Sequence, residues 1–543
     1  MTDEAPKATE HESTPGPADA PEIGGGYSKY VLAVLTLVYV FNFIDRNILA
    51  ILAQEIKADL GLSDAQLGFL YGTAFAVFYA VFGIPLGRLA DIWVRRKLIA
   101  VGLGFWSVMT ALSGTARSFF SLGTYRIGVG IGESSASPAA FSMLCDYFPP
   151  RLRATAMSIY SSGIYIGAGI GVFLGGWVID GWKALYPDGN APFGLAAWQA
   201  AFFIVGLPGL LLALWVWTLR EPVRGQSEGI VETAAHPEPF REFFRELAAV
   251  VPPLTLWSLL RARVAPRVLV LNLGAAGALA AIAWGLILWL GSPSQWIALA
   301  IGLYAFFSWT QQLALRDPPA FAMIFKSRAL LFGIIGFSWI GFVTYGLGFW
   351  AAPYFIRAFG VSTGEVGTVL GLSAAIGGWI GINAGGIVSD RLKPRTPWAR
   401  ILIGFAVIVL TAPVVLLMLR TDNIRTAYAL YFVFMLVSPM WIGPVVATAN
   451  ELVLPRMRGI SSAFYILTVT FIGLALGPYT IGKTSDAFMS AGVDSADALR
   501  NGMMIALLSL LIGAIFLFFA GRHVGHEEGT RMERARAAGE PGI

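Results

Sequence analysis

Hydrophobic residues along the chain are gathered into runs of about 20, and polar and charged residues lie in the short segments between them. A run of that length crosses the hydrocarbon core of a bilayer as an α-helix, which satisfies its own backbone hydrogen bonds in lipid. The chain has no repeated short segments of alternating polarity of the kind that forms a membrane β-barrel. The pattern therefore predicts an all-α membrane protein.

Twelve of these runs form two sets of six, with a long insert between the sets. The first set covers 29–53, 65–87, 98–116, 121–145, 154–180 and 197–219, and the second covers 329–356, 364–388, 399–419, 426–450, 459–482 and 500–521. The insert holds two more apolar runs, 268–290 and 296–315, joined by a short neutral turn. The sequence thus predicts fourteen spans: two six-helix halves and an inserted two-helix hairpin.

These runs divide the chain into five segments: a disordered cytoplasmic tail, an N-terminal six-helix bundle, a central linker that contains the hairpin, a C-terminal six-helix bundle and a second cytoplasmic tail. Their ranges are 1–27, 28–220, 221–327, 328–522 and 523–543. Within the linker, four apolar residues recur at helical spacing: Phe240, Phe243, Phe244 and Leu247. This spacing predicts an amphipathic helix on the membrane surface or against the bundle.

Composition narrows the classes of site that the chain can form. Hydrophobic residues make up 56% of the chain and charged residues 13%, against about 25% charged in soluble domains. Cys145 is the single cysteine, so an intramolecular disulfide and a cysteine-cluster metal site are excluded. The four histidines all fall in predicted tails or loops: His11, His236, His523 and His526. We therefore expect no metal and no cofactor other than protons as a coupling ion.

Basic residues in alternate short loops indicate the orientation. They are Arg95, Arg96, Lys97, Arg151, Arg153, Arg391, Lys393, Arg395, Arg456 and Arg458. We expect this side and both chain ends to face the cytoplasm. The net charge of +5 is explained by these loops and needs no nucleic-acid partner. The chain has no Asn-x-Ser/Thr acceptor, which is compatible with a bacterial inner membrane.

The two halves repeat two short motifs in the same order, at offsets close to 300 residues. Gly87, three residues and Asp91 follow the second span, and Gly386, three residues and Asp390 follow the eighth. A Pro-Arg pair precedes the fifth and eleventh spans, at 150–151 and 455–456. Two six-helix halves in the same orientation are typical of a transporter with its site between the halves near mid-membrane.

The motif Gly87-x3-Asp91-x3-Arg95-Arg96-Lys97 resembles the signature loop of the major facilitator superfamily. Within that superfamily, three stretches resemble the spinster-type lysolipid transporters: 42–47 (Asn-Phe-Ile-Asp-Arg-Asn), 126–133 (Arg-Ile-Gly-Val-Gly-Ile-Gly-Glu) and 345–350 (Tyr-Gly-Leu-Gly-Phe-Trp). The resemblance implies a major facilitator fold and transport by alternating access. The inserted hairpin departs from the twelve spans usual in the spinster branch.

Four charged residues lie well inside predicted spans: Asp45, Arg46, Arg126 and Glu133. Each costs about 2.5–3.5 kcal/mol at a helix centre on insertion scales, and their charges sum to zero, which suggests mutual pairing. The spinster resemblance implies that Asp45, Arg46 and Glu133 form a coupled cluster near the substrate. Our hypothesis is that Asp45 and Glu133 change protonation during transport. The alternative is a permanent ion-pair network, and for Arg126 we favour a helix-pairing role.

The resemblance assigns a gating role to the loop that contains Gly87, Asp91, Arg95 and Arg96, because its counterpart in the superfamily latches one conformation. The repeated residues Gly386, Asp390 and Arg391 extend that prediction to the second half. Basic residues alone would support only a role in orienting the chain in the membrane.

Further residues are candidates for lining a central cavity: Asn42, Tyr160, Tyr345, Trp350, Tyr354 and Tyr465. For any single aromatic residue the alternative is a core or interfacial position. The spans after the hairpin carry almost no mid-span charge. A cavity charged on one wall and apolar on the other suits an amphipathic substrate.

We therefore expect a monomeric secondary transporter that moves a lysophospholipid or sphingolipid-like molecule and is proton-coupled, with membrane lipids as its surroundings. One alternative is a proton-linked carrier or exporter of small organic anions or drugs. A second is a non-transporting membrane sensor, although neither tail holds a sizeable soluble domain. An enzyme is not expected, because no span holds a histidine or two carboxylates at one-turn spacing.

Overall fold

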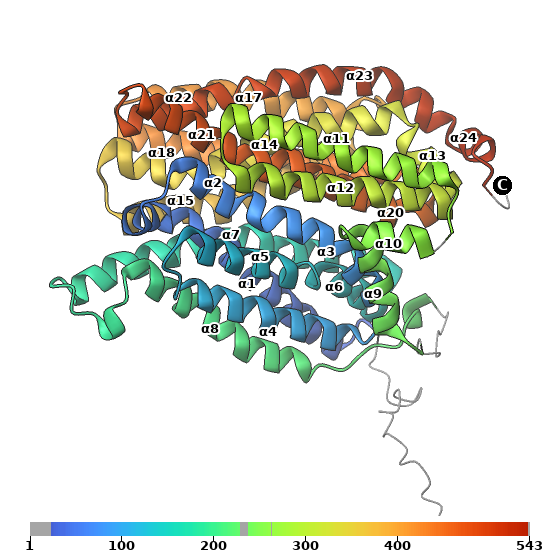
Figure 1. Cartoon of the computed structure of the whole chain (residues 1–543), viewed down its shortest axis with the longest axis horizontal. Helices are drawn as coiled ribbons and strands as arrows, with labels where there is room; N and C mark the ends of the chain where they lie inside the picture. The colour runs from blue at the N-terminus through green and yellow to red at the C-terminus, as the bar shows by residue number, and fades with distance from the viewer. Residues whose placement is uncertain (1–22, 229–236, 262, 541–543) are drawn as a thin grey trace, which may run out of the picture.

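A computed structural model describes residues 23–228, 237–261 and 263–540. In this part of the chain the helices run side by side along the long axis of the molecule, and no strand is present (Figure 1). Residues 1–22 of the predicted N-terminal tail lie outside the described part. Gly26 and Tyr27, which the sequence analysis assigned to that tail, are instead the first residues of the first helix.

The N-terminal half consists of eight α-helices that build the first six predicted spans. They are α1 (Gly26–Leu60), α2 (Asp64–Tyr71), α3 (Thr73–Ile92), α4 (Arg95–Ser113), α5 (Phe119–Glu133), α6 (Ala136–Tyr147), α7 (Pro150–Leu185) and α8 (Ala197–Trp217). Two predicted spans are each built from two helices. The second is broken at Gly72, between α2 and α3, and the fourth is broken between α5 and α6.

The described residues of the linker form five α-helices and the short 3₁₀ turn η3 (Gln226–Glu228), and two of the α-helices form the apolar hairpin. The helices are α9 (Pro239–Val250), α10 (Leu254–Arg261), α11 (Pro266–Leu290), α12 (Pro293–Arg316) and α13 (Pro318–Phe325). The predicted amphipathic segment lies in α9. Phe243 of this helix packs against the core, whereas Phe244 is exposed. The helix therefore rests against the bundle with only part of its apolar face.

The C-terminal half repeats the arrangement with several irregular turns. Its elements are α14 (Arg328–Phe359), α15 (Thr363–Leu372), the π-helical turn η4 (Ser373–Gly378), α16 (Trp379–Leu392), α17 (Ala399–Arg420), α18 (Ile424–Val437), the 3₁₀ turn η5 (Ser438–Trp441), α19 (Ile442–Glu451), the 3₁₀ turn η6 (Pro455–Met457), α20 (Arg458–Val469), the π-helical turn η7 (Thr470–Ala475), α21 (Leu476–Ser490), α22 (Ser495–Ala506), α23 (Ser509–Gly529) and α24 (Arg531–Ala537).

In the described part of the chain, twelve helices are long and apolar enough to cross a membrane, counting a continuous stretch of helix as one. Ten belong to the two halves and two are α11 and α12. The predicted spans 98–116 and 121–145 do not meet the test. The first follows three consecutive basic residues in α4, and the second is split into two short helices, one of which carries Arg126 and Glu133. Fourteen spans therefore stays a prediction.

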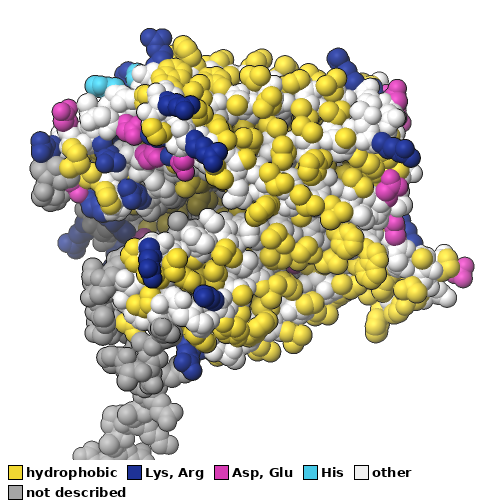
Figure 2. All heavy atoms as spheres, turned by 180° about the vertical axis from the view of Figure 1, so that it is seen from behind, with side chains coloured by type: hydrophobic (Ala, Val, Ile, Leu, Met, Phe, Trp, Pro, Cys, Tyr) yellow, Lys and Arg dark blue, Asp and Glu magenta, His cyan; other side chains and the backbone are white. Residues whose placement is uncertain are grey.

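The surface divides into an apolar belt and two charged ends, as expected of a membrane protein. On the face that Figure 2 shows, charged side chains gather at the two ends of the long axis, and the surface between them is nearly free of charge and rich in hydrophobic side chains. We call the end that carries Arg95, Arg151, Arg391 and Arg456 the basic end, and the other the opposite end. The C-terminus lies at the basic end (Figure 1).

Glycines on α7 let this helix approach its neighbours closely. A Cβ atom on Gly167 would lie 2.3 Å from the carbonyl oxygen of Val40 in α1. On another face of α7, a Cβ atom on Gly169 would lie 2.4 Å from the carbonyl oxygen of Gly371 in α15. Small residues at helical spacing permit backbone-to-backbone contact of this kind within a membrane. Thus α7 joins α1 of its own half to α15 of the other half.

Candidate functional site

The four charges predicted inside spans come together between α1 and α5, and we call them the central charge cluster. Arg46 Nη2 donates to Glu133 Oε2 at 2.7 Å and to Asn42 Oδ1 at 3.3 Å. The side chain of Glu133 is fully buried and that of Arg46 is 11% exposed. The pairing predicted from their zero net charge is therefore present for Arg46 and Glu133.

Asp45 does not take part in that ion pair. Its side chain is 1% exposed, and among the described residues neither carboxyl oxygen has a hydrogen-bond partner. Arg126 is fully buried and donates through Nη1 to the backbone oxygen of Asp45 at 3.1 Å, not to its carboxyl group. An ionised carboxylate buried without a donor has a large desolvation cost. In this arrangement an ionised Asp45 would have no compensating hydrogen bond from the described residues to its carboxyl group.

Two donors on α4 lie near the Asp45 carboxyl group without bonding to it. They are the indole N–H of Trp106 and the hydroxyl group of Thr110. Both are buried, and neither has a partner in the described part of the chain. The Asp45 carboxyl group therefore lies beside two donors that have no other partner among the described residues.

Aromatic rings surround the guanidinium group of Arg46. Its Cζ atom lies 4.4 Å from the ring centre of Phe75, 4.6 Å from that of Phe43 and 5.2 Å from that of Tyr79. Cation–π contacts of this kind stabilise a charge that has lost its water. The rings come from α1 and α3, so the cluster is bounded by three helices of the N-terminal half.

The position of Glu133 follows from the end of α5. The next two residues, Ser134 and Ser135, turn their hydroxyl groups back to the carbonyl oxygens of Ile131 and Gly132, at 2.7 and 2.8 Å. Serine side chains that bond to the preceding turn bend or end helices. The last residue of α5 is therefore held at a break within the fourth span.

Three of the predicted cavity residues gather near this cluster. Tyr160 stacks on Tyr39 with ring centres 4.3 Å apart, and its buried hydroxyl group has no partner among the described residues. Tyr345 of α14 and Tyr465 of α20 reach the same region from the other half, close enough to interact electrostatically with each other and, in the case of Tyr465, with Tyr39. Tyrosines from both halves thus meet beside the central charge cluster.

Two other predicted cavity residues are held in packing contacts. Trp350 is fully buried, and its indole N–H donates to the carbonyl oxygen of Pro478 at 2.8 Å. Tyr354 donates to the carbonyl oxygen of Leu419 at 3.3 Å inside the C-terminal half. The structure therefore places Trp350 and Tyr354 among packing residues instead of beside the central charge cluster.

In the predicted gating loop, the arginines are bound while the aspartate is exposed. Arg95 is fully buried, forms an ion pair with Asp146, and donates through Nε to Glu221 at 2.7 Å. Arg96 donates to the backbone oxygen of Trp217 at 2.6 Å. In the described part of the chain, Asp91 has no hydrogen bond or ion pair. A gating role for this loop stays a prediction.

The second half repeats these ion pairs with different residues. Arg400 pairs with Asp390 at 2.5 Å and with Glu451 at 2.8 Å, whereas the predicted Arg391 is exposed. Neither Gly87 nor Gly386 has any neighbouring atom within 4 Å of the place of a Cβ atom. In this conformation the two glycines are therefore not required for close packing.

Sequence reasoning missed a cluster that joins the two halves at the opposite end. Asp64, at the start of α2, is fully buried and receives both guanidinium nitrogens of Arg357 at 2.7 Å. Lys57 and Ser485 also donate to Asp64, at 2.6 and 2.8 Å. The carboxylate of Asp486 in turn accepts the backbone N–H groups of Asp64 and the next residue.

The sequence held a weak signal for this cluster. Ser63 to Gln66 reads as a helix-capping box, and the box is present, but it gave no reason to expect a partner for Asp64 in the other half. Arg357 follows the apolar run of the seventh span and looked like an ordinary charge at a helix end. The structure shows that the halves are closed against each other at the opposite end.

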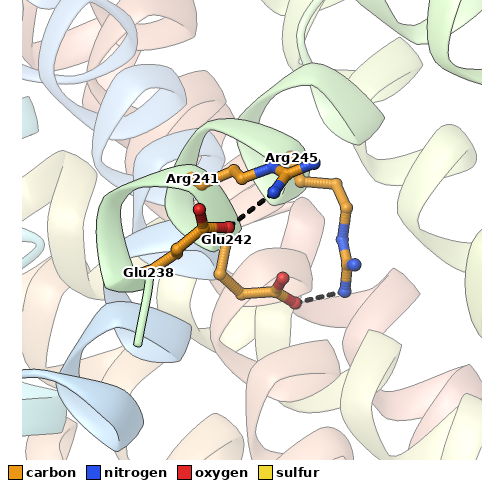
Figure 3. A pocket seen from close by; sticks show the side chains of 4 residues that line it. All are labelled: Glu238, Arg241, Glu242 and Arg245. Atoms are coloured by element: carbon orange, nitrogen blue, oxygen red, sulfur yellow. Dashed lines mark hydrogen bonds and ion pairs between the residues drawn. The ribbon is translucent and has the colours of Figure 1, made fainter. Parts of the chain in front are cut away.

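A surface hollow on α9 does not form part of this site. Figure 3 shows its four lining side chains, Glu238, Arg241, Glu242 and Arg245, which enclose about 360 Å³. They form two ion pairs along one helix, Arg241 with Glu238 and Arg245 with Glu242. The charges of these four side chains on α9 therefore compensate one another. The described residues contain no group of three His, Cys, Asp or Glu side chains arranged to hold a metal ion.

Comparison with known proteins agrees with this architecture. The family model described as Major Facilitator Superfamily matches residues 35–266. An MFS-type efflux pump of Mycolicibacterium smegmatis is 25% identical over 494 residues, which cover 90% of this chain and 91% of the relative. The human protein spinster homolog 1 is 25% identical over 516 residues, which cover 91% of this chain and 80% of the relative.

A solved structure extends the likeness to the whole fold. It is a bacterial homologue of the human lysosomal transporter spinster, in an inward-facing and unoccupied conformation. The two chains are 27% identical with a TM-score of 0.70, and the match covers 92% of this chain and 98% of the other. The chain thus contains a Major Facilitator Superfamily domain over residues 35–266, and as a whole it resembles the spinster branch of that superfamily.

Proposed function

We propose that the protein moves an amphipathic substrate, a lysophospholipid or sphingolipid-like molecule, by alternating access and in exchange for or together with protons. The observation that carries this proposal is the buried carboxyl group of Asp45, which has no partner among the described residues and lies beside the Arg46–Glu133 ion pair. A buried acid next to a charged pair is a site where binding and release of a proton can be linked to rearrangement of the pair.

The distribution of charge supports the amphipathic substrate. Asp45, Arg46, Arg126 and Glu133 all lie in the N-terminal half, whereas the spans of the C-terminal half carry their charges near their ends. A polar head group would interact with the charged wall, and an acyl chain would lie against the apolar wall. The resemblance to spinster-type lysolipid transporters points to the same class of molecule.

A second candidate function is favoured by the relative in Mycolicibacterium smegmatis, which is named as an efflux pump. In that case the substrate would be a small organic anion or drug. The same cluster would then bind the polar part of a compact molecule, and no acyl chain would be needed for transport.

The proposal includes a setting for the transporter. We place it in a bacterial inner membrane with both chain ends in the cytoplasm, as a monomer that needs protons and no other cofactor. The basic end is then cytoplasmic. Because the halves are closed at the opposite end by Asp64 and Arg357, the conformation described here would be inward-facing. Asp91 would be free of its latch in this state.

Uptake into proteoliposomes tests the class of substrate. We would compare labelled lysophosphatidylcholine with a labelled small organic anion, using excess unlabelled forms of each as competitors. The proposal predicts movement of the lysolipid that only amphiphiles with one acyl chain inhibit. Movement of the anion without the lysolipid, from protein shown to be folded, would favour the second candidate.

Two variants, each of which replaces one glutamate by glutamine, distinguish loss of the central charge cluster from the loss of any negative charge. Glu133→Gln removes the partner of Arg46 inside the bundle. Glu55→Gln removes a carboxylate that is paired with Lys183 at the exposed surface. We expect the first variant to lose most lysolipid movement and the second to retain it.

A further inference from the structure

The inserted hairpin lies along the boundary between the two halves, where α3 of the first half faces α20 and η7 of the second. Figure 1 shows α12 running beside α20. The other hairpin helix, α11, faces outward: only 6% of its most apolar 18-residue stretch is buried. A pair of helices that served only as extra membrane anchors would not need to contact both halves. By contrast, α12 contacts both halves along its whole length, as its contacts at the two ends and in the middle show.

At the opposite end, α12 begins between the halves. Gln295 is buried and accepts a hydrogen bond from Thr73 of α3 at 2.7 Å. The next residue, Trp296, packs edge-on against Tyr479 of α21, with ring centres 5.5 Å apart. Two successive residues of the hairpin therefore contact different halves.

In the middle of α12 the same division is repeated. A Cβ atom on Gly302 would lie 3.0 Å from Val77 of α3 and 2.6 Å from the ring of Phe471 in η7. One turn later, Phe306 stacks on Phe464 of α20, with ring centres 6.0 Å apart. The helix fits so closely here that a larger residue at position 302 would have to displace the side chain of Phe471 or Val77.

At the basic end, two consecutive residues form ion pairs with different parts of the molecule. Arg316 pairs with Glu246 of α9 at 2.7 Å, and α9 itself packs on the end of α3 through Phe240 and Trp93. Asp317 pairs at 2.5 Å with Arg456 of η6, in the C-terminal half. The hydrogen bond from Arg456 lowers the pKa of Asp317, so the carboxylate is ionised and the pair is present at neutral pH.

The contacts of α12 extend from Gln295 to Asp317, and 22 residues of helix measure about 33 Å. That length equals about the thickness of the hydrocarbon core of a bilayer. α2 packs directly on α21 at the opposite end and α3 on η7 near the middle, whereas contacts between α3 and α20 are few. Without α12, the stretch of the boundary along α20 would therefore face lipid.

The boundary on the other side of the molecule has no such cover. Near the opposite end, α7 packs tightly on α15: a Cβ atom on Gly176 would lie 2.5 Å from the carbonyl oxygen of Thr363. Towards the basic end, α7 and α16 have few contacts. The two halves thus meet along two boundaries. The α3–α20 boundary is covered by α12, whereas no helix of the described chain covers the α7–α16 boundary, which is therefore the more open of the two.

We propose that α12 closes the boundary between α3 and α20 to membrane lipid, so that an amphiphile reaches the central charge cluster laterally by way of the α7–α16 boundary. The inference about the route rests on the proposed function. The inference that α12 excludes lipid does not, because it concerns any acyl chain in the membrane.

Photoreactive lipids test both parts on the whole protein in lipid bilayers. One probe is lysophosphatidylcholine with a diazirine in its acyl chain, and the other is a diacyl phosphatidylcholine that carries the same group. The sites of attachment would be mapped by mass spectrometry. We expect lysolipid adducts on α7 and α16 that excess unlabelled lysolipid removes, and no adduct of either probe at Val77 or Phe464.

A pair of variants makes the result specific to the hairpin. Phe306→Ala removes the ring that packs on Phe464, and we expect at least a fivefold rise in diacyl adducts at Val77 and Phe464. Trp284→Ala removes an aromatic ring from the exposed face of α11 and should leave the adduct pattern unchanged.

The outcomes separate the two ideas. Diacyl adducts at Val77 or Phe464 in the unaltered protein would overturn the role of α12. Lysolipid adducts that are competed away at those residues, instead of on α7 and α16, would overturn the route. If no lysolipid adduct is removed by competitor while the diacyl probe is still excluded, the proposed function fails and the exclusion by α12 stands.

Discussion

Arg357 of α14 and Asp64 of α2 form a two-pronged ion pair, with both nitrogen–oxygen distances at 2.7 Å, and this pair joins the two halves at the opposite end. Asp64 is fully buried, and the side chain of Arg357 is 6% exposed. An ion pair so well enclosed stabilises the closed arrangement only while both partners are present, because removal of one leaves the other with fewer partners in a buried place.

Loss of this pair is expected to open the opposite end. Arg357→Gln should disfavour the closed state, because it removes two charge-assisted hydrogen bonds between the halves. Lys57 and Ser485 still donate to Asp64, so we expect a loss smaller than the roughly 3–5 kcal/mol that follows when a buried charge loses its one partner. Spin labels placed on α2 and α21 would measure the distance between the halves by electron resonance. Lys183→Gln, which removes an exposed ion pair within one half, is the control. An unchanged distance distribution in Arg357→Gln would show that other contacts close this end.

The two internal arginines of the repeated loops should differ in their effect on stability. Arg95 is fully buried and binds Asp146 and Glu221, whereas Arg400 pairs with Asp390, which is 71% exposed, and with Glu451. Water can replace an exposed partner but not a buried one. We therefore expect Arg95→Gln to lower the Tm in detergent by more than Arg400→Gln. Equal shifts would contradict the difference in burial.

Glycine 167 offers a test of packing with a matched control on the same helix. In Gly167→Ala the new methyl group would lie 2.3 Å from the oxygen of Val40, so α7 must move away from α1. Overpacking of this kind costs about 1–3 kcal/mol. Gly181→Ala has open space around the new atom. Thermal unfolding should show a lower Tm for the first variant only, and an equal Tm for both would contradict the contact.

Glycine 87 should behave differently from the packing glycines. A Cβ atom fits there in the present conformation, and alanine favours a helix over glycine by about 0.8–1 kcal/mol. We expect Gly87→Ala to keep or raise the Tm but to slow transport, because the loop must pack against the other half when the latch forms. Gly83→Ala, with similar open space, is the control. Full transport activity in Gly87→Ala would remove the support for a gating role.

The sequence could predict what depends on local pattern. Runs of apolar residues indicated the helices, and the motif from Gly87 to Lys97 led to the family, which the comparisons confirm. The charges inside spans identified Asp45, Arg46, Arg126 and Glu133 as neighbours. The prediction of fourteen spans is not confirmed, since the segments of α4 and of α5 with α6 combine charges or a break with limited apolar length.

What the sequence could not show depends on contacts between distant segments. Asp64 and Arg357 are nearly 300 residues apart, and each resembles an ordinary charge near a helix end. The exposure of Arg391 and the use of Arg400 in its place follow from the direction in which each side chain leaves its helix, which a repeat of residue types does not specify. The roles assigned to Asp45, Arg46 and Glu133 in transport stay predictions.

The central claim is that the movement of a lysolipid is coupled to the movement of protons through the site at Asp45. The most direct measurement uses proteoliposomes that contain a pH-sensitive dye and have no initial pH gradient, to which lysophosphatidylcholine is added. We expect a change of internal pH that follows lysolipid movement in the unaltered protein and is absent in Asp45→Asn. Lysolipid movement without a change of internal pH, or an unaltered pH change in Asp45→Asn, would contradict proton coupling at this residue.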